Sequence, residues 1–211
     1  MIFCDIGNTY FHFYDTKSIW KVAPENLDKK FLTSQVYYIS VCKEHEQKLL
    51  KLQHHARNIA EYIEIDTLYV GMGIDRKAAC LSIFDGVVVD AGSAITIDVM
   101  HEGMHLGGCI LPGLFAYMHG YASISPVLKK SFNFNLNLDD LPQNTQDAIS
   151  FGVFKSLKGI IESMAKNKKI FFTGGDGKFL SKFFNNSIYD EMLIFRGMEK
   201  TFKDICSKEI K

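Results

Sequence analysis

Residues 4–9 read CDIGNT, and residues 89–94 read VDAGSA. In both stretches an apolar run ends in an aspartate, a glycine turn with small polar residues follows, and a second apolar run comes next. The same device used twice in one chain indicates a duplicated half-domain. We therefore predict an α/β protein of two similar halves, residues 1–78 and 79–211, each a mixed sheet flanked by helices.

The apolar pattern around these two stretches predicts the same opening for each half, three strands joined by tight turns. Around the first stretch we expect strands at 1–6, 10–14, 19–22 and 36–41, a helix at 43–62, a short strand at 68–70 and a helix at 77–84. Around the second we expect strands at 87–91, 95–99, 106–111 and 170–173, and helices from 113 to about 128, over 145–166, after 177 and over 197–207.

The composition is that of an ordinary globular protein, with 211 residues and 47% hydrophobic content. Twenty-four basic residues balance 24 acidic ones, so no global positive field favours nucleic acid or an anionic membrane as a partner. The five cysteines include no CxxC pair, which favours a reduced protein. No signal peptide or membrane-spanning run is apparent, and we expect a cytoplasmic protein.

The two aspartate turns have the chemistry that a polyphosphate needs. Glycine lacks a Cβ, so backbone N–H groups can approach phosphate closely, and Asn8, Thr9 and Ser93 would add side-chain donors. Carboxylates repel phosphate, so Asp5 and Asp90 make sense as holders of a cation or of its waters. A plain hairpin turn is the alternative for either copy alone, and the repetition disfavours it.

A third glycine turn, TGG at 173–175, lies between a predicted strand and a predicted helix, where a nucleotide could approach a helix N-terminus. Two DxG hairpins followed by strand, TGG and helix resemble the actin, Hsp70 and sugar-kinase superfamily. The resemblance implies two ribonuclease-H-like halves that clamp ATP in the cleft between them.

Two further segments narrow the resemblance. GIDR at 73–76 matches the GxDR element, and GGCILPG at 107–113 matches the GGxIxPG element, of type III pantothenate kinases. Together with the aspartate turns, these motifs occur in the family's order from residue 5 to Thr173. The chain thus resembles that family over nearly its whole length.

The resemblance implies ATP-dependent phosphorylation of pantothenate to 4'-phosphopantothenate, the first step of coenzyme A biosynthesis. It also implies Mg²⁺, a monovalent cation (K⁺ or NH₄⁺) and a homodimer. By motif, Asp75 would be the general base, Asp90 would bind the monovalent cation, and Asp5 would hold Mg²⁺, directly or through its water. Pantothenate would contact Gly73, Ile74, Asp75, Arg76 and Thr173. ATP would contact Asp5, Ile6, Gly7, Asn8, Thr9, Tyr10, Phe11, His12 and Ser93.

These roles agree with the physics of phosphoryl transfer, in which the protein positions reactants and neutralises charge. A carboxylate can take the proton of the attacking hydroxyl, and an arginine can clamp a substrate carboxylate. The alternative for Asp75 and Arg76 is a solvated ion pair at a helix start. The aromatic contact to pantothenate that is usual in the family has two candidates, Tyr62 and Tyr69.

Two other functions remain open: a kinase for another acceptor, such as a sugar or acetate, and a non-catalytic regulator that keeps the fold. Intact Asp5, Asp75 and Asp90 favour catalysis. The histidines suggest no metal site: we expect His45, His54 and His55 to be solvated on the 43–62 helix, and His101 and His105 to lie in a turn.

Overall fold

The computed structural model describes the backbone of residues 1–209 and the side chains of residues 1–207. They form two compact units: unit 1 comprises 1–84, 101–106 and the chain from 192 onward, and unit 2 comprises 85–100 and 107–191. The sequence predicted a boundary at residue 78 between two duplicated halves. Compact units are a different criterion, so that boundary stays a prediction.

Unit 1 is built on a five-stranded mixed sheet in the order β3-β2-β1-β4-β5. Strand β1 pairs antiparallel with β2 and parallel with β4. The strands are β1 (Ile2–Ile6), β2 (Phe11–Tyr14), β3 (Ile19–Val22), β4 (Val36–Ser40) and β5 (Arg57–Asn58). The helices of this unit are α1 (Lys43–Leu52), α2 (Ile74–Leu81) and α6 (Leu193–Glu209).

Alternation along β1 gives this sheet two buried faces, because successive strand residues point to opposite sides. Ile2, Cys4 and Ile6 pack in one core with Leu49 of α1. Phe3 packs in the other core, with residues of α2 and α6. Since Asp5 alternates with Cys4 and Ile6, it lies on the α2 and α6 side of the sheet.

Helices α2 and α6 pack closely, and a glycine makes this possible. A Cβ built on Gly197 of α6 would collide with the backbone of Ala78 in α2. The sequence predicted that the last helix begins at Gly197, but α6 begins at Leu193. The glycine is inside the helix because it permits the close approach.

Unit 2 repeats the strand order of unit 1. Strand β7 (Gly86–Ala91) pairs antiparallel with β8 (Ala94–His101) and parallel with β10 (Ile170–Thr173), just as β1 pairs with β2 and β4. The order β9-β8-β7-β10-β11 therefore corresponds to β3-β2-β1-β4-β5. The remaining strands are β9 (Met104–Pro112) and β11 (Ser187–Tyr189). This common order supports a duplicated fold.

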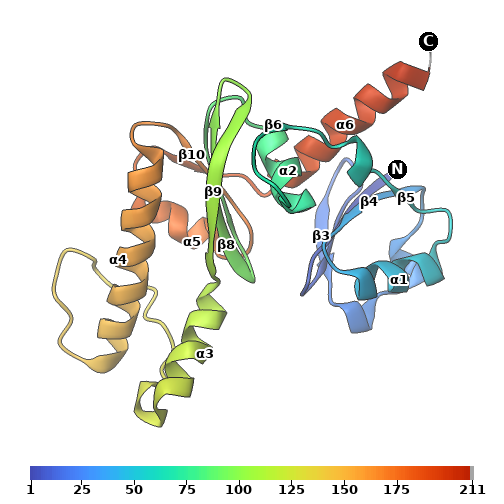
Figure 1. Cartoon of the computed structure of the whole chain (residues 1–211). Helices are drawn as coiled ribbons and strands as arrows, with labels where there is room; N and C mark the ends of the chain where they lie inside the picture. The colour runs from blue at the N-terminus through green and yellow to red at the C-terminus, as the bar shows by residue number, and fades with distance from the viewer. Residues whose placement is uncertain (210–211) are drawn as a thin grey trace. The chain divides into compact units, whose positions relative to one another are not determined.

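The core of unit 2 lies between one face of this sheet and a long helix. Val87, Val89 and Ala91 of β7 pack with Phe154 and Leu157 of α4. The helices are α3 (Leu114–Ile124), α4 (Thr145–Ala165) and α5 (Gly177–Leu180), and Figure 1 labels them. Asp90, which alternates with Val89 and Ala91, points to the opposite face.

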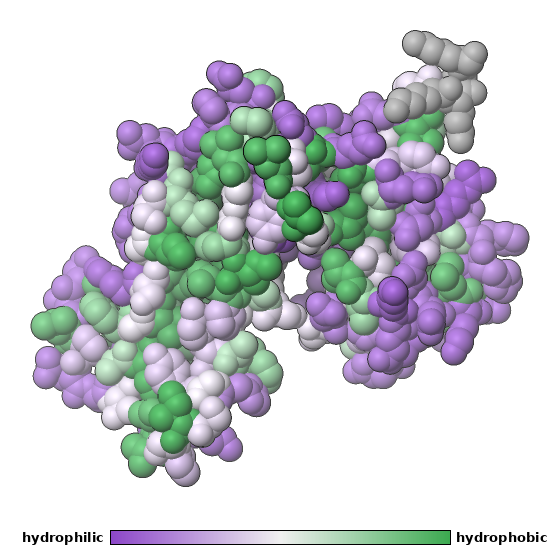
Figure 2. Space-filling model, viewed as in Figure 1, coloured by the Kyte–Doolittle hydropathy of each residue, from purple (hydrophilic) through white to green (hydrophobic). Residues whose placement is uncertain are grey.

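Helix α3 leaves part of its apolar surface exposed. Of its 11 residues only Leu114 is buried, whereas Phe115 is 69% and Ile124 72% exposed. On the face shown in Figure 2, hydrophobic residues lie exposed along β9 and at the lower end of α3. Exposed apolar residues gathered on one helix are typical of a surface that binds another molecule.

Other sequence predictions need correction. The predicted helix 43–62 ends at Leu52, because the chain must turn back to pair β5 with β4. The predicted strand 68–70 is absent from the described chain: the strand is β6 (Asp66–Thr67), paired with β9, and Leu68 and Val70 are 96% and 94% exposed. Helix α2 begins at Ile74 rather than 77, after Gly73 as N-cap. Among the described residues, no helix is long and apolar enough to cross a membrane.

Candidate active site

Asp5 is the penultimate residue of β1 and is only 6% exposed. Its Oδ2 lies 3.7 Å from Nδ1 of His12, the residue opposite it on β2. Its Oδ1 is buried, and no group in the described part of the chain forms a hydrogen bond with it. A buried carboxylate oxygen without a donor suits a cation or a cation-bound water.

The turn after Asp5 is closed by the N–H of Gly7, which donates to the carbonyl of Tyr10 (3.0 Å). Asn8 and Thr9 are exposed on it, as phosphate donors must be. Ile6 and Phe11 are fully buried in the core. Those two predicted ATP contacts could therefore be made only through the backbone.

His45 of α1 holds this turn from behind. Its Nδ1 lies 2.9 Å from the carbonyl oxygen of Gly7, and since a carbonyl only accepts, Nδ1 carries the proton. The imidazole is 9% exposed and packs against the ring of Phe11, with centroids 5.7 Å apart. The prediction that His45 is solvated is wrong, because the first turn of α1 faces the glycine turn rather than solvent.

Asp75 lies in the first turn of α2, and its Oδ1 accepts from the backbone N–H of Arg76 (2.8 Å). Burial, and then the negative charge of Asp5, raise the pKa of the Asp75 carboxyl, while Arg76 opposes the shift. The charge of Asp5 thus acts on the Asp75 carboxyl within unit 1. A carboxylate with a raised pKa is a stronger proton acceptor than an ordinary aspartate.

Arg76 is 5% exposed, and its guanidinium lies over the ring of Tyr69, 4.8 Å from the centroid. The alternative of a solvated surface pair is therefore wrong for Arg76. Of the two tyrosine candidates, Tyr69 contacts Arg76, whereas Tyr62 lines a separate cavity with Tyr37 and Phe202.

His105 supports Tyr69 and is a residue that the sequence reasoning missed. It was expected in a turn, but it is buried on β9, and its Nδ1 lies 2.7 Å from Oγ1 of Thr67. The same Oγ1 accepts from the N–H of Tyr69 (3.0 Å). The pairing of β6 with β9 creates this contact, and no local sequence signal indicates it.

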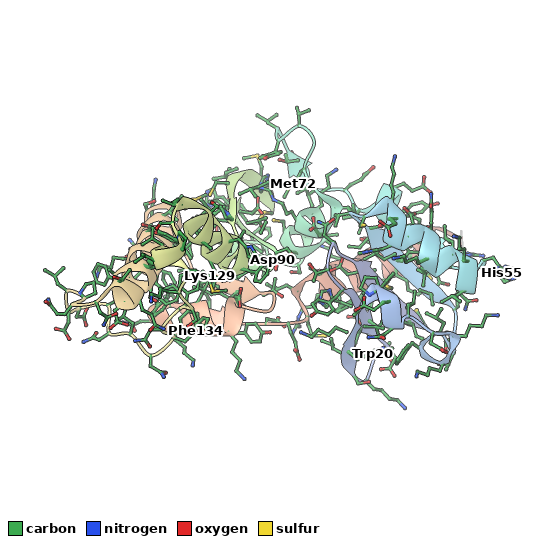
Figure 3. The ribbon with its side chains drawn as sticks, turned by 90° about the horizontal axis from the view of Figure 1, so that it is seen from below. Trp20, His55, Met72, Asp90, Lys129 and Phe134 are labelled. Carbon is green, nitrogen blue, oxygen red and sulfur yellow. The ribbon has the colours of Figure 1, made fainter. Side chains whose placement is uncertain are left out.

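In unit 2, three oxygen-bearing side chains lie in a row across three strands. Asp90, labelled in Figure 3, is opposite Thr96 on β8 and opposite Thr173 on β10. Directly opposed residues share a face of the sheet. Oγ1 of Thr96 is buried, without a hydrogen-bond partner among the described residues. The row offers only oxygen atoms, the donors that hard cations prefer.

Two glycines pack around the second aspartate turn. Gly174 has φ +81°, and a Cβ there would collide with the Asp90 carboxylate and the Ala91 carbonyl. A Cβ on Gly113 would collide with the carbonyls of Gly92 and Ser93. The TGG turn and the GGxIxPG segment therefore both pack against the turn that carries Ser93, which is exposed.

Comparison with known proteins places this arrangement in a family. The sequence model described as type III pantothenate kinase matches residues 30–167. The type III pantothenate kinase of Helicobacter hepaticus is 54% identical over 96% of this chain and 98% of its own length. That of Wolinella succinogenes is 49% identical over 97% and 98%. The chain belongs to the type III pantothenate kinase family.

Solved structures agree with this membership. A Campylobacter jejuni protein described as a Baf-family transcriptional activator superimposes with a TM-score of 0.87 at 45% identity, covering 98% of this chain and 100% of its own. The pSK41 ParM protein, at 10% identity, has a TM-score of 0.51, covering 100% of this chain and 98% of its own. A Sinorhizobium meliloti protein described as a 2-dehydro-3-deoxygalactonokinase, at 8% identity, has a TM-score of 0.55, covering 97% and 98%. The last two show the fold alone, and the predicted actin-like α/β fold is confirmed.

We expect His45→Leu to loosen the first glycine turn, because the Gly7 carbonyl loses its donor. The loss should lower the free energy of unfolding by about 1 kcal/mol, measured by urea denaturation, and speed hydrogen exchange of the amides at 7–9. His45→Asn, which keeps a donor near the Nδ1 position, should recover part of both. Unchanged exchange in His45→Leu would contradict the supporting role.

Proposed function

We infer that this chain phosphorylates pantothenate with ATP, giving 4'-phosphopantothenate and ADP, the first step of coenzyme A biosynthesis. Membership of the type III pantothenate kinase family supports this activity directly. The observation that carries the chemistry is Asp75, a partly buried carboxyl of raised pKa beside Asp5, in the segment that matches GxDR.

We propose Asp75 as the general base. Its carboxylate takes the proton of the pantothenate primary hydroxyl as the hydroxyl oxygen bonds to the γ-phosphorus and the bond to the ADP oxygen breaks. The backbone N–H of Arg76 donates to Oδ1 and so fixes the carboxylate at the first turn of α2. Oδ2 does not take part in that bond. Fixing the base and the hydroxyl in one geometry supplies much of the rate enhancement expected in phosphoryl transfer.

Pantothenate carries a carboxylate, and we assign its recognition to Arg76. The Tyr69 ring beneath the guanidinium and the buried surroundings fix its orientation. A positioned guanidinium can bind a carboxylate through two parallel hydrogen bonds. We place Tyr69 at the pantothenate site, with Gly73 and Ile74 beside it and with Thr173 as a further contact.

We assign ATP to the glycine turns, with Asn8, Thr9 and Ser93 as side-chain donors and His12 near the phosphates. The unpaired Oδ1 of Asp5 fits Mg²⁺ or one of its waters. When bound, Mg²⁺ supplies positive charge that offsets the charge developing on the phosphates. His45 fixes the first glycine turn and thereby the direction of its backbone N–H groups. Asp5 places its carboxylate beside that turn, near the end of β1.

For the monovalent cation, K⁺ or NH₄⁺, we propose the row of Asp90, Thr96 and Thr173. The Thr96 hydroxyl, which has no hydrogen-bond partner among the described residues, supports this assignment. Burying a hydroxyl costs free energy unless it bonds to another group or to an ion. Thr96 extends the predicted site, which contained Asp90 alone.

We propose a homodimer in which α3 packs against a second copy of the chain. The support is the apolar character of α3 together with the exposure of Phe115 and Ile124. Burial of such a surface stabilises association in proportion to the apolar area removed from water. The cytoplasmic location that the sequence indicates stays a prediction.

A regulatory function is the second candidate, because the similar Campylobacter jejuni structure is described as a transcriptional activator. The balanced charge of the chain disfavours direct binding to nucleic acid. Another acceptor for the same ATP chemistry is the third. ADP release with a different acceptor, and not with pantothenate, would favour the kinase for another acceptor. No ADP release with any acceptor, from a protein that is demonstrably folded, would favour the regulatory function.

Asp75→Asn should lower kcat at least about 100-fold, the usual contribution of a general base. ADP release with ATP, Mg²⁺ and pantothenate in potassium buffer measures it, and calorimetry should still detect pantothenate binding. Asp204→Asn, at an exposed position on α6, is the matched control and should keep full activity. Undiminished turnover by Asp75→Asn would exclude Asp75 as the base.

The same variant tests the pKa of Asp75. Because the folded-state pKa is raised, stability falls as pH rises through it, and the ionised carboxylate destabilises the fold at neutral pH. Asp75→Asn should therefore melt at the same temperature as wild type or higher near pH 7.5, with the difference vanishing in acid. The wild-type rate should fall in acid at a higher pH than an ordinary aspartate would dictate.

Thr96→Val should raise the potassium concentration for half-maximal rate several-fold, because the cation loses one oxygen ligand. Stability in sodium buffer should not fall, since valine replaces a hydroxyl that has no partner in the described part of the chain. Thr145→Val, at an exposed helix position, is the control. An unchanged potassium requirement in Thr96→Val would remove Thr96 from the site.

Phe115→Lys should weaken the proposed dimer, because it places a charge in the apolar contact. Sedimentation velocity should show a shift from dimer to monomer, while circular dichroism stays unchanged. Leu141→Lys replaces an equally exposed apolar residue (77%) outside α3 and should leave the dimer intact. A monomeric wild type, or a dimer insensitive to Phe115→Lys, would contradict the interface.

A further inference from the structure

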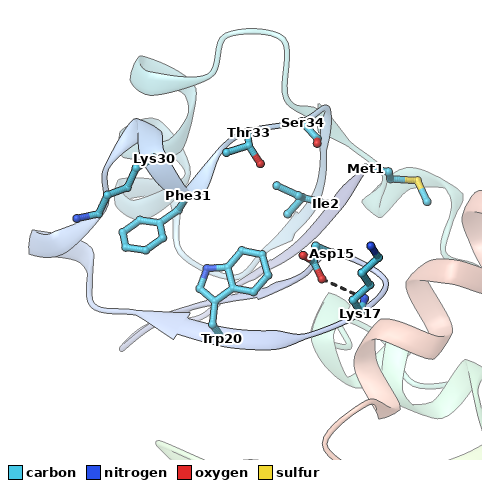
Figure 4. A pocket seen from close by; sticks show the side chains of 9 residues that line it. All are labelled: Met1, Ile2, Asp15, Lys17, Trp20, Lys30, Phe31, Thr33 and Ser34. Carbon is cyan, nitrogen blue, oxygen red and sulfur yellow. Dashed lines mark hydrogen bonds between the residues drawn. The ribbon is translucent and has the colours of Figure 1, made fainter.

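A second cavity, of about 270 Å³, lies in unit 1 at the end of the sheet opposite the glycine turn. Figure 4 shows Trp20 beneath it, Ile2, Thr33 and Ser34 above it, and Lys30 and Lys17 at opposite sides. The remaining lining residues are Met1, Asp15 and Phe31. Nothing in the proposed reaction uses these side chains.

The floor of the cavity is a tryptophan with an unused donor. The Trp20 indole stacks on Phe13, with centroids 5.5 Å apart and an interplanar angle of 18°, which fixes its orientation. Its Nε1 is buried, and no acceptor among the described residues bonds to it. Buried N–H groups almost always have a partner, so this one suits an acceptor that the chain does not supply.

The charged groups around the cavity favour an anion. Lys17 and Lys30 line it, and Lys30 Nζ lies over the Phe31 ring, 5.1 Å from the centroid. The one carboxylate, Asp15, is already satisfied by its own turn: it accepts from the N–H groups of Lys17 and Ser18 and from the Ser18 hydroxyl. Asp15 keeps its negative charge in these bonds, so two lysines against one carboxylate give the lining a net positive charge.

The cavity is separate from the nucleotide turn. Ile2 opens β1 and lines the cavity, whereas Asp5 is three residues further along the strand, about 10 Å away at the usual rise per residue. The turn with Asn8 and Thr9 lies beyond Asp5. A ligand at each end of the sheet could therefore bind at the same time.

We propose that this cavity, called here the Trp20 site, binds a small organic anion with a flat apolar part. The anionic group would accept from Trp20 Nε1 and pair with Lys17 or Lys30, and the flat part would pack against Trp20 and Phe31. Aromatic faces with a few convergent polar groups are typical of small-molecule sites. This ligand is additional to the ATP and pantothenate of the proposed function.

Trp20 is the single tryptophan of the chain, so its fluorescence reports directly on this site. Phenyl phosphate is a suitable probe, and benzyl alcohol is its uncharged counterpart. In the presence of ADP, Mg²⁺ and pantothenate, which fill the other sites, we expect phenyl phosphate to change Trp20 fluorescence saturably. Benzyl alcohol should bind much more weakly. A signal abolished by ADP and pantothenate would place the probe in the active site and overturn the proposal.

Lys17→Gln and Lys30→Gln should each raise the dissociation constant of phenyl phosphate about threefold or more. Lys29→Gln, an exposed neighbour that does not line the cavity, should leave it unchanged. Trp20→Phe keeps a flat ring and removes the N–H, and calorimetry should show weaker binding. Absence of saturable binding to wild type, or equal binding by wild type and a Lys17→Gln, Lys30→Gln double variant, would overturn the proposal.

Discussion

The carboxylate of Asp5, near the end of β1, repels that of Asp75, in the first turn of α2, and this repulsion is the central electrostatic constraint of unit 1. Burial, and then the negative charge of Asp5, raise the pKa of the Asp75 carboxyl. The backbone N–H of Arg76 at the N-terminus of α2 and the charge of Arg76 oppose this shift, because they favour the charged form of Asp75. Asp5 keeps one oxygen without a donor among the described residues. Two carboxylates that repel each other destabilise the protein without ligands. A bound cation would relieve this repulsion.

The duplicated strand order gives each half the same framework with different chemistry on it. Asp5 and Asp90 are both penultimate residues of a central strand. Across the strands, however, Asp5 meets His12 and Ile39, while Asp90 meets Thr96 and Thr173. One copy therefore offers a single carboxylate beside an imidazole, and the other offers an all-oxygen row. These neighbours, rather than the aspartates themselves, give the two copies their different chemistry.

The sequence predicted what local patterns determine. Alternation and glycine turns located the central strands and both aspartate turns, and the ordered motifs predicted the family. The residues that support the site were missed because their partners are distant: His45 and Gly7, like His105 and Thr67, are 38 positions apart. Thr96 was passed over because its significance comes from strand register. The helix predicted at 43–62 was wrong beyond Leu52 for a related reason. Ile59 and Ile63 flank a short 3-10 helix, and they pack in the core that contains Phe3.

The route of the chain has a consequence for synthesis. Helix α2, which carries Asp75, packs against α6, and α6 is made only after the whole of unit 2. On the ribosome, the α2 side of the sheet in unit 1 therefore stays without its packing against α6 until α6 emerges. Phe3, Ile39 and Ala78 remain without their final neighbours during that time. A chain truncated before α6 would leave the helix that carries Asp75 without this packing, so unit 1 is completed only after unit 2 has been made.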